Sequence, residues 1–288
     1  MADEIRAVEA SGEAEVMAVR AISIMYHDIV AADGDASASG FASADADVYK
    51  IDKDVFEEHL RRIAKSLGRR RVVTTDVLPQ QRGGDLPPLL ITFDDGGVSA
   101  YTQAIDALEA HGWRGHFFVA ADHIGEPSFL GRAQLREMHA RGHVVGSHSS
   151  SHPARMSRCS WGELLREWRG SVDVLSDVIG AEVNAASVPG GYYSRKVAAA
   201  AARAGIKTLF TSEPVTRSWR VEDCLVLGRY TIQRWTPPAV VAALAAGAAA
   251  PRFKQFLLWN AKKTLKAAGG EYYVKVRKSL LKNSAASR

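Results

Sequence analysis

Two short segments of the chain carry the residue types that could perform chemistry. The first spans residues 92–97 and places two adjacent aspartates, Asp94 and Asp95, directly before two glycines. Adjacent carboxylates are costly to bury unless a cation or a proton gives them different roles. Both can reach one site only where a strand gives way to a loop, because neighbouring strand residues point to opposite faces. Gly96 and Gly97 supply that backbone freedom. The competing interpretation is a solvated turn with an aspartate cap.

The second segment, residues 148–152, begins and ends with a histidine. Two imidazoles four residues apart can face one side of a helical turn and chelate one metal ion. One added carboxylate gives a His₂Asp set, which leaves positions open for water and substrate as a catalytic zinc site requires. Nine histidines in 288 residues produce such pairs by chance, so His148 and His152 alone are weak evidence. Their combination with the aspartate pair indicates a metal site.

The elements that must position these residues form a repeating pattern of apolar strands and amphipathic helices. Repeated strand–helix units imply a parallel sheet covered by helices, hence an α/β barrel or a doubly wound sheet. In both architectures ligands bind at the carboxyl ends of the strands. Residues 31–47 are small and polar and are expected to form a long surface loop. We expect strands at residues 21–26, 89–93, 115–120, 143–146, 185–188, 208–211 and 224–227, and helices at 55–67, 98–111, 132–141, 160–179 and 194–204.

Together the two motifs resemble those of the polysaccharide deacetylases of carbohydrate esterase family 4, the NodB-homology domain. Residues 92–96 match that family's TFDDG motif, and residues 148–152 match its H-[ST]-x-x-H motif. The resemblance covers about residues 20–235 and implies a distorted (β/α) barrel, often seven-stranded. It also implies metal-dependent removal of acetyl groups from N-acetylated sugars. Further similarity lies in MYHD at residues 25–28, GHFFV at 115–119 and ARGHVVGSHS at 140–149.

Carried over by position, the resemblance makes Asp94 the general base. Asp95, His148 and His152 become the ligands of one divalent metal, with zinc favoured and cobalt or nickel as alternatives. A metal can polarise the amide carbonyl and acidify a bound water. A carboxylate within hydrogen-bond reach then takes the proton of the attacking water.

The residues expected to contact the substrate lie in two later segments. A backbone N–H of the loop after Pro189 can stabilise the tetrahedral oxyanion, because glycines at 190 and 191 let the backbone approach closely. By the resemblance, Leu227 lines the pocket of the acetyl methyl group. The expected substrate-binding residues are therefore Pro189, Gly190, Gly191, Tyr192 and Leu227.

Two departures from the family pattern are informative. The third family motif is R-x-P-[aromatic]-G, whose arginine holds the catalytic base, but residue 187 here is a serine. Another cation must therefore orient Asp94, and the sequence does not identify it.

The fifth motif is L-x-H, whose histidine is the general acid, and Arg229 replaces that histidine. Arginine does not release a proton near neutral pH. Arg229 is thus expected to neutralise the oxyanion or to bind an acidic group of the substrate.

The general acid must then come from elsewhere. His27 is the leading candidate because it follows an expected strand and should lie on the same rim. The alternative is a structural histidine bonded to a neighbouring loop. His116 and Tyr192 are weaker candidates for the acid.

Composition restricts the class of protein. Apolar residues make up 47% and charged residues 24% of the chain, which excludes wholesale disorder. No stretch approaches the roughly 20 apolar residues of a membrane-spanning helix. The N-terminus is acidic and has no apolar core, so a secretory signal is not expected. Cys159 and Cys224 cannot form a disulfide framework. We expect a cytoplasmic, optionally membrane-peripheral protein, and the sequence gives no indication of oligomeric state.

Three segments are expected: a polar leader at 1–20, the catalytic barrel at 21–235, and a helical, basic extension at 236–288 packed on the barrel. The net charge of +5 arises in the extension, since residues 252–288 hold ten basic residues and one acid. A solvated helix face is the default explanation, and peripheral contact with an anionic membrane is the alternative. No recognition motif supports nucleic-acid binding.

The sequence thus predicts a metal-dependent hydrolase that removes N-acetyl groups from a sugar, in a polysaccharide or a lipid-linked saccharide precursor. One alternative is hydrolysis of a non-sugar amide or imide. A second is a catalytically weak, metal-containing sugar-binding relative, which the loss of the family acid favours and the retention of Asp94 opposes. Among the six tryptophans, Trp219 and Trp235 are the candidates for sugar stacking.

Overall fold

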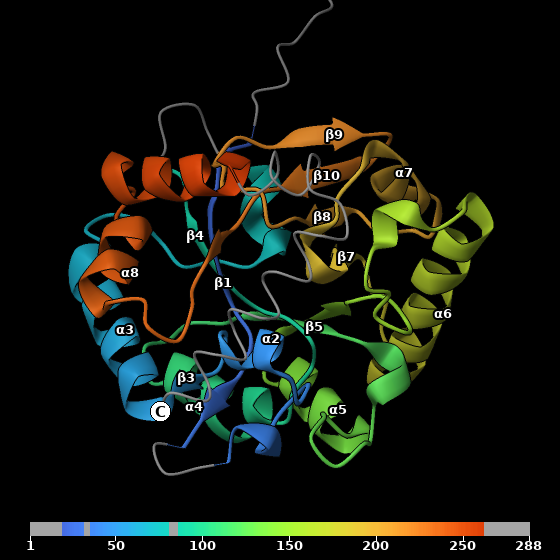
Figure 1. The fold of residues 1–288 in the computed structure, drawn as a ribbon, viewed down its shortest axis with the longest axis horizontal. Coiled ribbons are helices and arrows are strands. Elements are labelled where there is room, and N and C mark those ends of the chain that lie inside the picture. Colours follow the sequence, from blue (N-terminus) through green and yellow to red (C-terminus); the bar gives the residue numbers. More distant parts are fainter. Residues whose placement is uncertain (1–18, 32–34, 81–85, 262–288) are drawn as a thin grey trace, which may run out of the picture.

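The computed structural model describes residues 19–31, 35–80 and 86–261 (Figure 1). Its strands are β1 Ile22–Tyr26, β2 Ile29–Val30, β3 Ile51–Asp52, β4 Leu89–Phe93, β5 His116–Val119, β6 Val144–Ser147, β7 Ala185–Ser187, β8 Thr208–Phe210, β9 Trp219–Val221, β10 Cys224–Leu227 and β11 Tyr230–Thr231. Its α-helices are α2 Ala44–Asp47, α3 Lys53–Ser66, α4 Ile105–Glu109, α5 Arg132–Ala140, α6 Trp161–Ile179, α7 Arg195–Arg203 and α8 Pro238–Ala245.

One curled sheet of nine strands organises the molecule, in the order β11-β1-β4-β5-β6-β7-β8-β10-β9. Neighbouring strands run parallel except β9, which pairs antiparallel with β10. Within the described residues no pairing joins β9 to β11, so the barrel is open between these two strands. The predicted parallel α/β barrel is confirmed, and its helices lie around the sheet in Figure 1.

The strands are apolar on both faces, as parallel strands covered on both sides must be. One face packs against the helices, where Ile91 and Phe93 of β4 join a core with residues of α3 and α4. The other face points into the barrel, where Leu90 packs with Phe118 and Phe210. The inner face becomes polar toward the carboxyl ends, because Thr92 lies on the same face as Leu90 and is fully buried.

Local sequence signals set several helix boundaries. Helix α6 begins at a capping box in which the Ser160 hydroxyl accepts from the Glu163 backbone N–H, while the Glu163 carboxylate accepts from the Ser160 N–H. It ends at Gly180, whose φ of 68° lies in the left-handed region that glycine favours. The expected helix over 98–111 is shorter and irregular, since a π-helical turn at Ala100–Ala104 precedes α4.

The segment at 31–47 was expected to be a long surface loop; the described residues 35–47 do lie at the surface, but they include a 3₁₀ turn at Ala36–Ala38 and helix α2. Buried polar groups hold the segment against the barrel. The fully buried Lys50 ammonium donates to the carbonyls of Ala36 and Ser39, and the Asp28 carboxylate accepts from the Ser39 hydroxyl at 2.6 Å. A side chain at Gly40 would place its Cβ 2.2 Å from Asp28 Oδ2. Hydrogen bonds therefore hold the segment against the barrel, because it has few apolar residues that could pack there.

The C-terminal region was expected to be helical throughout, but Gly247, with a φ of 79°, interrupts it. Helix α8 packs through Val241 and Leu244, both fully buried. The following helical residues 249–261 leave Phe253 and Leu257 exposed. The rest of the basic extension and residues 1–18 of the leader lie outside the described residues. In the part that is described, no helix is both long and apolar enough to span a bilayer.

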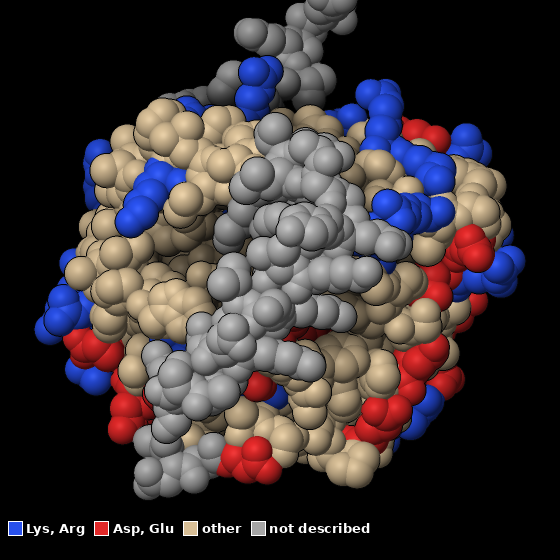
Figure 2. All heavy atoms as spheres, viewed as in Figure 1, with Lys and Arg blue, Asp and Glu red and all other residues tan. Residues whose placement is uncertain are grey.

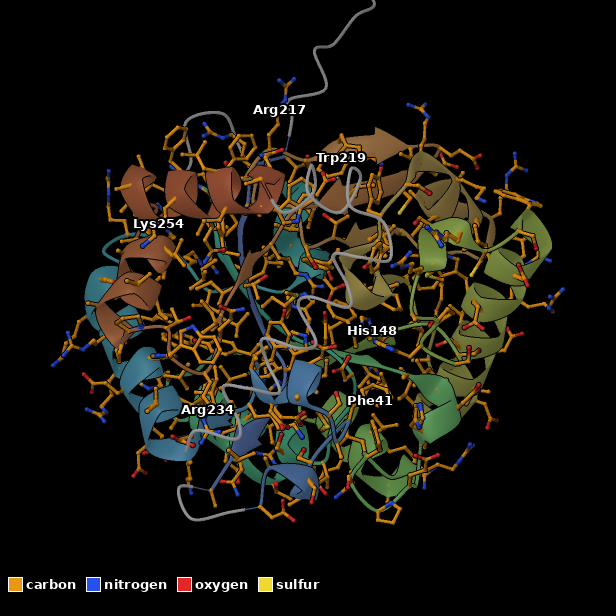
Figure 3. All side chains as sticks on the ribbon, viewed as in Figure 1. Phe41, His148, Arg217, Trp219, Arg234 and Lys254 are labelled. Atoms are coloured by element: carbon orange, nitrogen blue, oxygen red, sulfur yellow. The ribbon has the colours of Figure 1, made fainter. Side chains whose placement is uncertain are left out.

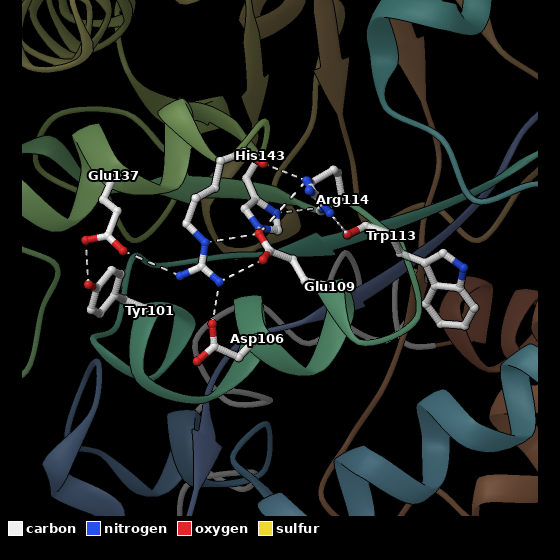
Figure 4. Close-up of polar contacts among 9 residues, drawn as sticks. Tyr101, Asp106, Glu109, Trp113, Arg114, Glu137 and His143 are labelled. Carbon is white, nitrogen blue, oxygen red and sulfur yellow. Dashed lines mark hydrogen bonds and ion pairs between the residues drawn. The ribbon is translucent and has the colours of Figure 1, made fainter.

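The amino ends of β5 and β6 are joined by a charge cluster, drawn in Figure 4. Arg141 forms ion pairs with Asp106, Glu109 and Glu137, and Glu109 also accepts from the ring of His143 at 3.0 Å. On the face of the molecule drawn in Figure 2, Lys and Arg gather mainly along the upper rim, and Asp and Glu lie mostly lower down.

Candidate active site

Six polar side chains converge at the carboxyl ends of the parallel strands, on the edge opposite to the charge cluster. They follow or end five different strands, so only the sheet topology brings them together. Figure 3 shows one of them, His148, near the centre of the molecule. The six are His27 after β1, Asp94 and Asp95 after β4, His148 after β6, Ser187 at the end of β7 and Arg229 after β10.

The turn after β4 directs both aspartates into the site. Asp94 is still held as strand backbone by its N–H bond to the Tyr26 carbonyl at 3.1 Å. Asp95 then has a φ of 76° and Gly96 a φ of 84°. A non-glycine residue at positive φ is uncommon and is found at functional sites. A Cβ at Gly96 would lie 2.9 Å from the Val119 side chain, so the sharp turn requires glycine there.

Asp95, His148 and His152 have the geometry of a metal-ligand set. The three candidate ligand atoms all lie within 4.8 Å of one another. The Oδ1 of Asp95 lies 3.3 Å from Nε2 of His148 and 3.5 Å from Nε2 of His152. Ligands about 2.1 Å from a tetrahedral zinc ion lie about 3.4 Å from one another. The chemistry and spacing of these donors therefore fit a divalent metal.

The pKa shifts of these candidate ligands also favour the binding of a cation. Burial by itself would raise the pKa of Asp95, but the hydrogen bonds to His148 and His152 hold that pKa well below its usual value. Burial would lower the pKa of His152, and the Asp95 carboxylate raises it instead. An ionised carboxylate that already attracts two imidazoles would equally attract a metal cation between them.

The neighbours of His148 determine which of its nitrogens faces the set. Its Nδ1 lies 2.6 Å from the Ser187 hydroxyl and 3.1 Å from the Ser187 carbonyl. A carbonyl can only accept, so Nδ1 carries a proton, and Nε2 is the nitrogen that faces Asp95. Metal-binding histidines in proteins are oriented by such a bond from the other ring nitrogen.

Asp94 is held by a bidentate ion pair with Arg229. The two distances are 2.6 Å from Nη1 to Oδ1 and 2.7 Å from Nη2 to Oδ2. The Ser187 hydroxyl donates a third bond to Oδ1 at 3.0 Å. Burial would raise the pKa of Asp94, but the charges of Arg229 and His148 lower it below its ordinary value. Asp94 is therefore an oriented carboxylate at neutral pH.

Arg229 is fully buried inside the barrel. Its Nε donates to the Thr211 carbonyl at 3.1 Å, and its guanidinium carbon lies 5.7 and 5.9 Å from the ring centroids of Phe118 and Phe210. The expectation that Arg229 meets the oxyanion or an acidic substrate group is corrected by this burial. The guanidinium faces Asp94, so Arg229 is the cation that orients Asp94 and that the sequence did not identify.

His27 lies at the rim, close enough to the aspartates for its charge to lower the pKa of both Asp94 and Asp95. Its ring stacks on Tyr49 at 4.5 Å. Among the described residues, its buried Nδ1 has no hydrogen-bond partner. A ring nitrogen that is buried without a protein partner is suited to a ligand.

The other acid candidates are differently placed. His116 is fully buried inside the barrel, where Nε2 accepts from the Thr75 N–H at 3.0 Å and Nδ1 lies 3.3 Å from the Ile91 carbonyl. Burial lowers the pKa of His116 to about 4, so it is a neutral structural residue. Tyr192 lies in the loop after β7, with the Arg155 guanidinium 5.8 Å from its ring.

The loop expected to contact the substrate forms a 3₁₀ turn at Pro189–Gly191, with Gly190 and Gly191 both at positive φ. A Cβ at Gly191 would lie 2.9 Å from the Ser212 hydroxyl. The N–H groups of Gly191 and Tyr192 bond to carbonyls within the turn, at 3.3 and 3.5 Å. Leu227 is 2% exposed and packs in the inner core.

Comparisons with known proteins relate this chain to deacetylases. Residues 82–209 match the sequence profile described as polysaccharide deacetylase. A peptidoglycan-N-acetylmuramic acid deacetylase of Bacillus subtilis, PdaA, is 26% identical over 138 residues, which is 47% of this chain and 50% of that protein. A chitooligosaccharide deacetylase of Rhizobium leguminosarum bv. trifolii is 33% identical over 86 residues, 30% of this chain and 38% of that protein. The chain thus spans about half the length of the curated relatives it matches.

Solved structures share the fold. The Streptococcus pyogenes deacetylase PplD, in complex with acetate, has a TM-score of 0.62 at 20% identity and covers 77% of this chain and 96% of that one. IcaB from Ammonifex degensii has a TM-score of 0.64 at 23% identity and covers 79% of this chain and 97% of that one.

Residues 82–209 belong to the polysaccharide deacetylase family.

The deacetylase match includes the Asp95, His148 and His152 set and the base candidate Asp94, but it ends before Arg229 and begins after His27. The candidate ligand set is thus part of the segment that carries the family signal. Arg229, which pairs with Asp94, and His27, which lies on the rim beside it, come from strands outside that segment.

Sequence reasoning missed two residues of this candidate site. Ser187 was noted only as a departure, yet its hydroxyl joins His148 to Asp94. Phe41, in the segment expected to be a loop, packs its ring 4.9 Å from that of His152 and 5.0 Å from that of His123 (Figure 3). An isolated aromatic among small residues was the available signal for Phe41.

Proposed function

We propose that this protein is a metal-dependent hydrolase that removes acetyl groups from N-acetylated sugar units, in a polysaccharide or a lipid-linked saccharide precursor. Membership of the deacetylase family supports the reaction class. The observation that carries the proposal is the pairing of an oriented carboxylate, Asp94, with an adjacent His₂Asp ligand set. Zinc is the proposed metal because two imidazoles and one carboxylate form the donor set of catalytic zinc sites.

Asp95, His148 and His152 would hold the metal, which when bound supplies a Lewis acid for the amide carbonyl and for water. Asp94 accepts a proton as water adds to the carbonyl carbon of the acetyl group. Arg229 fixes the direction of that carboxylate through two parallel N–H bonds. The carbon–nitrogen bond then breaks, and acetate and the free amine leave.

The departing nitrogen needs a proton, and we propose that His27 donates it. His27 lies on the rim beside both aspartates, and its Nδ1 has no hydrogen-bond partner among the described residues. A histidine is the side chain whose ordinary pKa suits proton donation near neutral pH.

Acetate release tests the proposal. The native protein, loaded with zinc or cobalt, is incubated with N-acetylglucosamine oligomers, and Asp94→Asn is assayed in parallel. The asparagine variant should retain its metal and lose about 10³-fold or more in kcat, because the amide cannot take the proton. Loss of the metal from Asp94→Asn would contradict the assignment of this residue as base. Stoichiometric metal without any acetate from the native protein would favour the sugar-binding alternative.

A further inference from the structure

The helical residues 249–261 turn apolar side chains toward solvent. Phe253 is 61% exposed, Leu257 and Leu258 are each 51% exposed, and Phe256 is exposed as well. Residues three and four positions apart are neighbours on a helix, so these side chains form one continuous surface, called the exposed face below. Among the described residues, four of the nine exposed large apolar side chains belong to it. Such a gathering marks an interaction site.

A polar contact on the opposite side of the helix fixes this orientation. Gln255 is two positions from both Phe253 and Leu257, hence on the other side of the helix. Its side chain accepts from the Thr231 N–H at 3.2 Å and donates to the Thr231 carbonyl at 3.1 Å. Thr231 belongs to β11, an edge strand of the sheet. Turning the helix to bury Phe253 would break both bonds and leave two backbone groups of that edge unpaired.

The same contact places the helix at the catalytic edge of the sheet. Strand β11 runs parallel to β1, and Thr231 is its last residue. Gln255 therefore docks at the carboxyl end of β11, the edge at which His27 follows β1. Figure 1 shows the helix in red-orange at the upper left. A partner that binds the exposed face is thus brought to the edge that carries the candidate active site.

Basic side chains border the exposed face. Residues 224–270 contain no aspartate or glutamate. Lys254 is exposed and lies three positions before Leu257, so the two are neighbours on the helix surface (Figure 3). Burial and the nearby charge of Arg252 both lower the pKa of Arg70, so two cations lie close together at this place. A local excess of positive charge favours an anionic partner.

We propose that the exposed face docks on an anionic phospholipid surface. Phenylalanine and leucine side chains bordered by lysine and arginine are typical of a helix that lies in a membrane interface. The apolar side chains enter the boundary of the acyl chains, and the cations reach the lipid phosphates. A second copy of this chain fits less well, because two exposed faces in contact would bring like charges together. Docking would turn the catalytic edge toward saccharides carried on the membrane, and only this consequence rests on the proposed function.

Co-sedimentation of the full chain with vesicles tests the proposal. The native protein should bind vesicles of equal parts phosphatidylglycerol and phosphatidylcholine about 10-fold more tightly than vesicles of phosphatidylcholine alone. Phe253→Ser/Leu257→Ser should weaken binding to the anionic vesicles by about 10-fold or more, because two apolar side chains no longer enter the bilayer. Both positions are exposed, so this double variant should keep the native fold, which circular dichroism checks. Unchanged binding by the double variant overturns the proposal.

Two further variants make the result specific. Trp161→Ser is the matched control, because it also removes an exposed aromatic side chain, but from the start of α6. It should bind the anionic vesicles as the native protein does, and a loss equal to that of the double variant would contradict a role of the exposed face. Lys254→Glu should weaken binding to the anionic vesicles by about 10-fold. Binding that is insensitive to this charge reversal overturns the proposal of an anionic partner.

Sedimentation velocity tests the rival occupant. A monomer in both the native protein and the double variant supports lipid docking. A native dimer that separates in the double variant would show that a second copy covers the exposed face, and would overturn the proposal. Vesicle binding requires no turnover, so Asp94→Asn should bind vesicles as the native protein does. The proposed function can therefore fail while lipid docking holds, and the reverse outcome is equally distinguishable.

Discussion

Strand β6 has a histidine immediately before it and another immediately after it, and the two have different surroundings. At the amino end, His143 accepts from the Gly115 N–H through Nδ1 and donates to Glu109 through Nε2, at 3.1 and 3.0 Å. At the carboxyl end, Nδ1 of His148 is bonded to Ser187, and Nε2 faces Asp95. Both rings are buried beside a carboxylate. A buried histidine next to an acid therefore does not by itself identify a site.

The difference lies in what surrounds the second ring nitrogen. In His143 the backbone N–H of Gly115 occupies Nδ1 and Glu109 accepts from Nε2, so the ring is saturated within the protein. In His148 Nε2 faces Asp95, which His152 also approaches, so a carboxylate and a second imidazole converge there. The converging third donor therefore distinguishes the candidate ligand from the structural residue.

The largest expected effect separates these two histidines directly. His148→Ala should lose the bound metal and all measurable acetate release, because two ligands hold a catalytic metal poorly. His143→Gln should retain both. Metal content by mass spectrometry of the purified variants, with the acetate assay, is the measurement. Full metal in His148→Ala would remove this residue from the ligand set.

The next effect concerns the arginine that orients Asp94. Arg229→Met should lower kcat by about 10²–10³-fold with little change in KM, since Asp94 loses its bidentate partner and stays buried. Arg229→Lys, which keeps the charge but not the paired geometry, should recover part of this loss. Steady-state kinetics measure both variants, and metal content should remain at the native level. An equal kcat in all three proteins would show that Asp94 needs no such partner.

A smaller loss is expected at the proposed acid. His27→Ala should lower kcat by about 10²-fold on an N-acetylated sugar, whose amine leaves only when protonated. Imidazole added to the buffer should restore part of the rate, because it can occupy the vacated space and supply the proton. An unchanged kcat in His27→Ala would exclude this role. Tyr49→Leu, which removes the stacked ring and keeps the His27 imidazole, is the matched control.

The smallest expected effect is on stability and concerns His143, at the amino end of β6. Burial lowers the pKa of His143, His59 and His116 to about 4 each. Each is neutral when folded but binds a proton near pH 6.5 when unfolded. Their stabilisation is therefore complete above pH 6.5 and is lost as the pH falls toward 4, at about 1.4 kcal/mol per pH unit for each histidine. In urea unfolding between pH 6.5 and 5, His143→Gln should show a shallower decline than the native protein; parallel declines would contradict the assignment.

The catalytic motifs were predictable because their signals are local. Asp94 and Asp95 lie next to the glycines that turn them inward, and His148 and His152 are four residues apart. The partner of Asp94 was not predictable in the same way. Arg229 is 135 positions along the chain, and only the strand order places it against the base. A tertiary contact of this kind leaves no spacing pattern in a single sequence.

The sheet was likewise predicted where strands are apolar and continuous, as in β4 and β10, whose bounds match the expectation. The short strands β2, β3, β9 and β11 were missed, whereas the equally short β7 and β8 were predicted within the repeating strand–helix pattern. The segment around Phe41 was misjudged for a different reason. Its order depends on hydrogen bonds to the buried Asp28 and Lys50, and composition does not reveal such partners.

The separation of Asp94 from Arg229 also has a consequence for the order in which a ribosome makes the protein. Chain elongation at about 5–20 residues per second leaves Asp94 without its guanidinium for on the order of ten seconds. All three candidate metal ligands, Asp95, His148 and His152, are synthesised within that interval. A nascent chain can therefore complete this candidate set before Asp94 is oriented. The pairing of Asp94 with Arg229 forms last, with the final strands of the sheet.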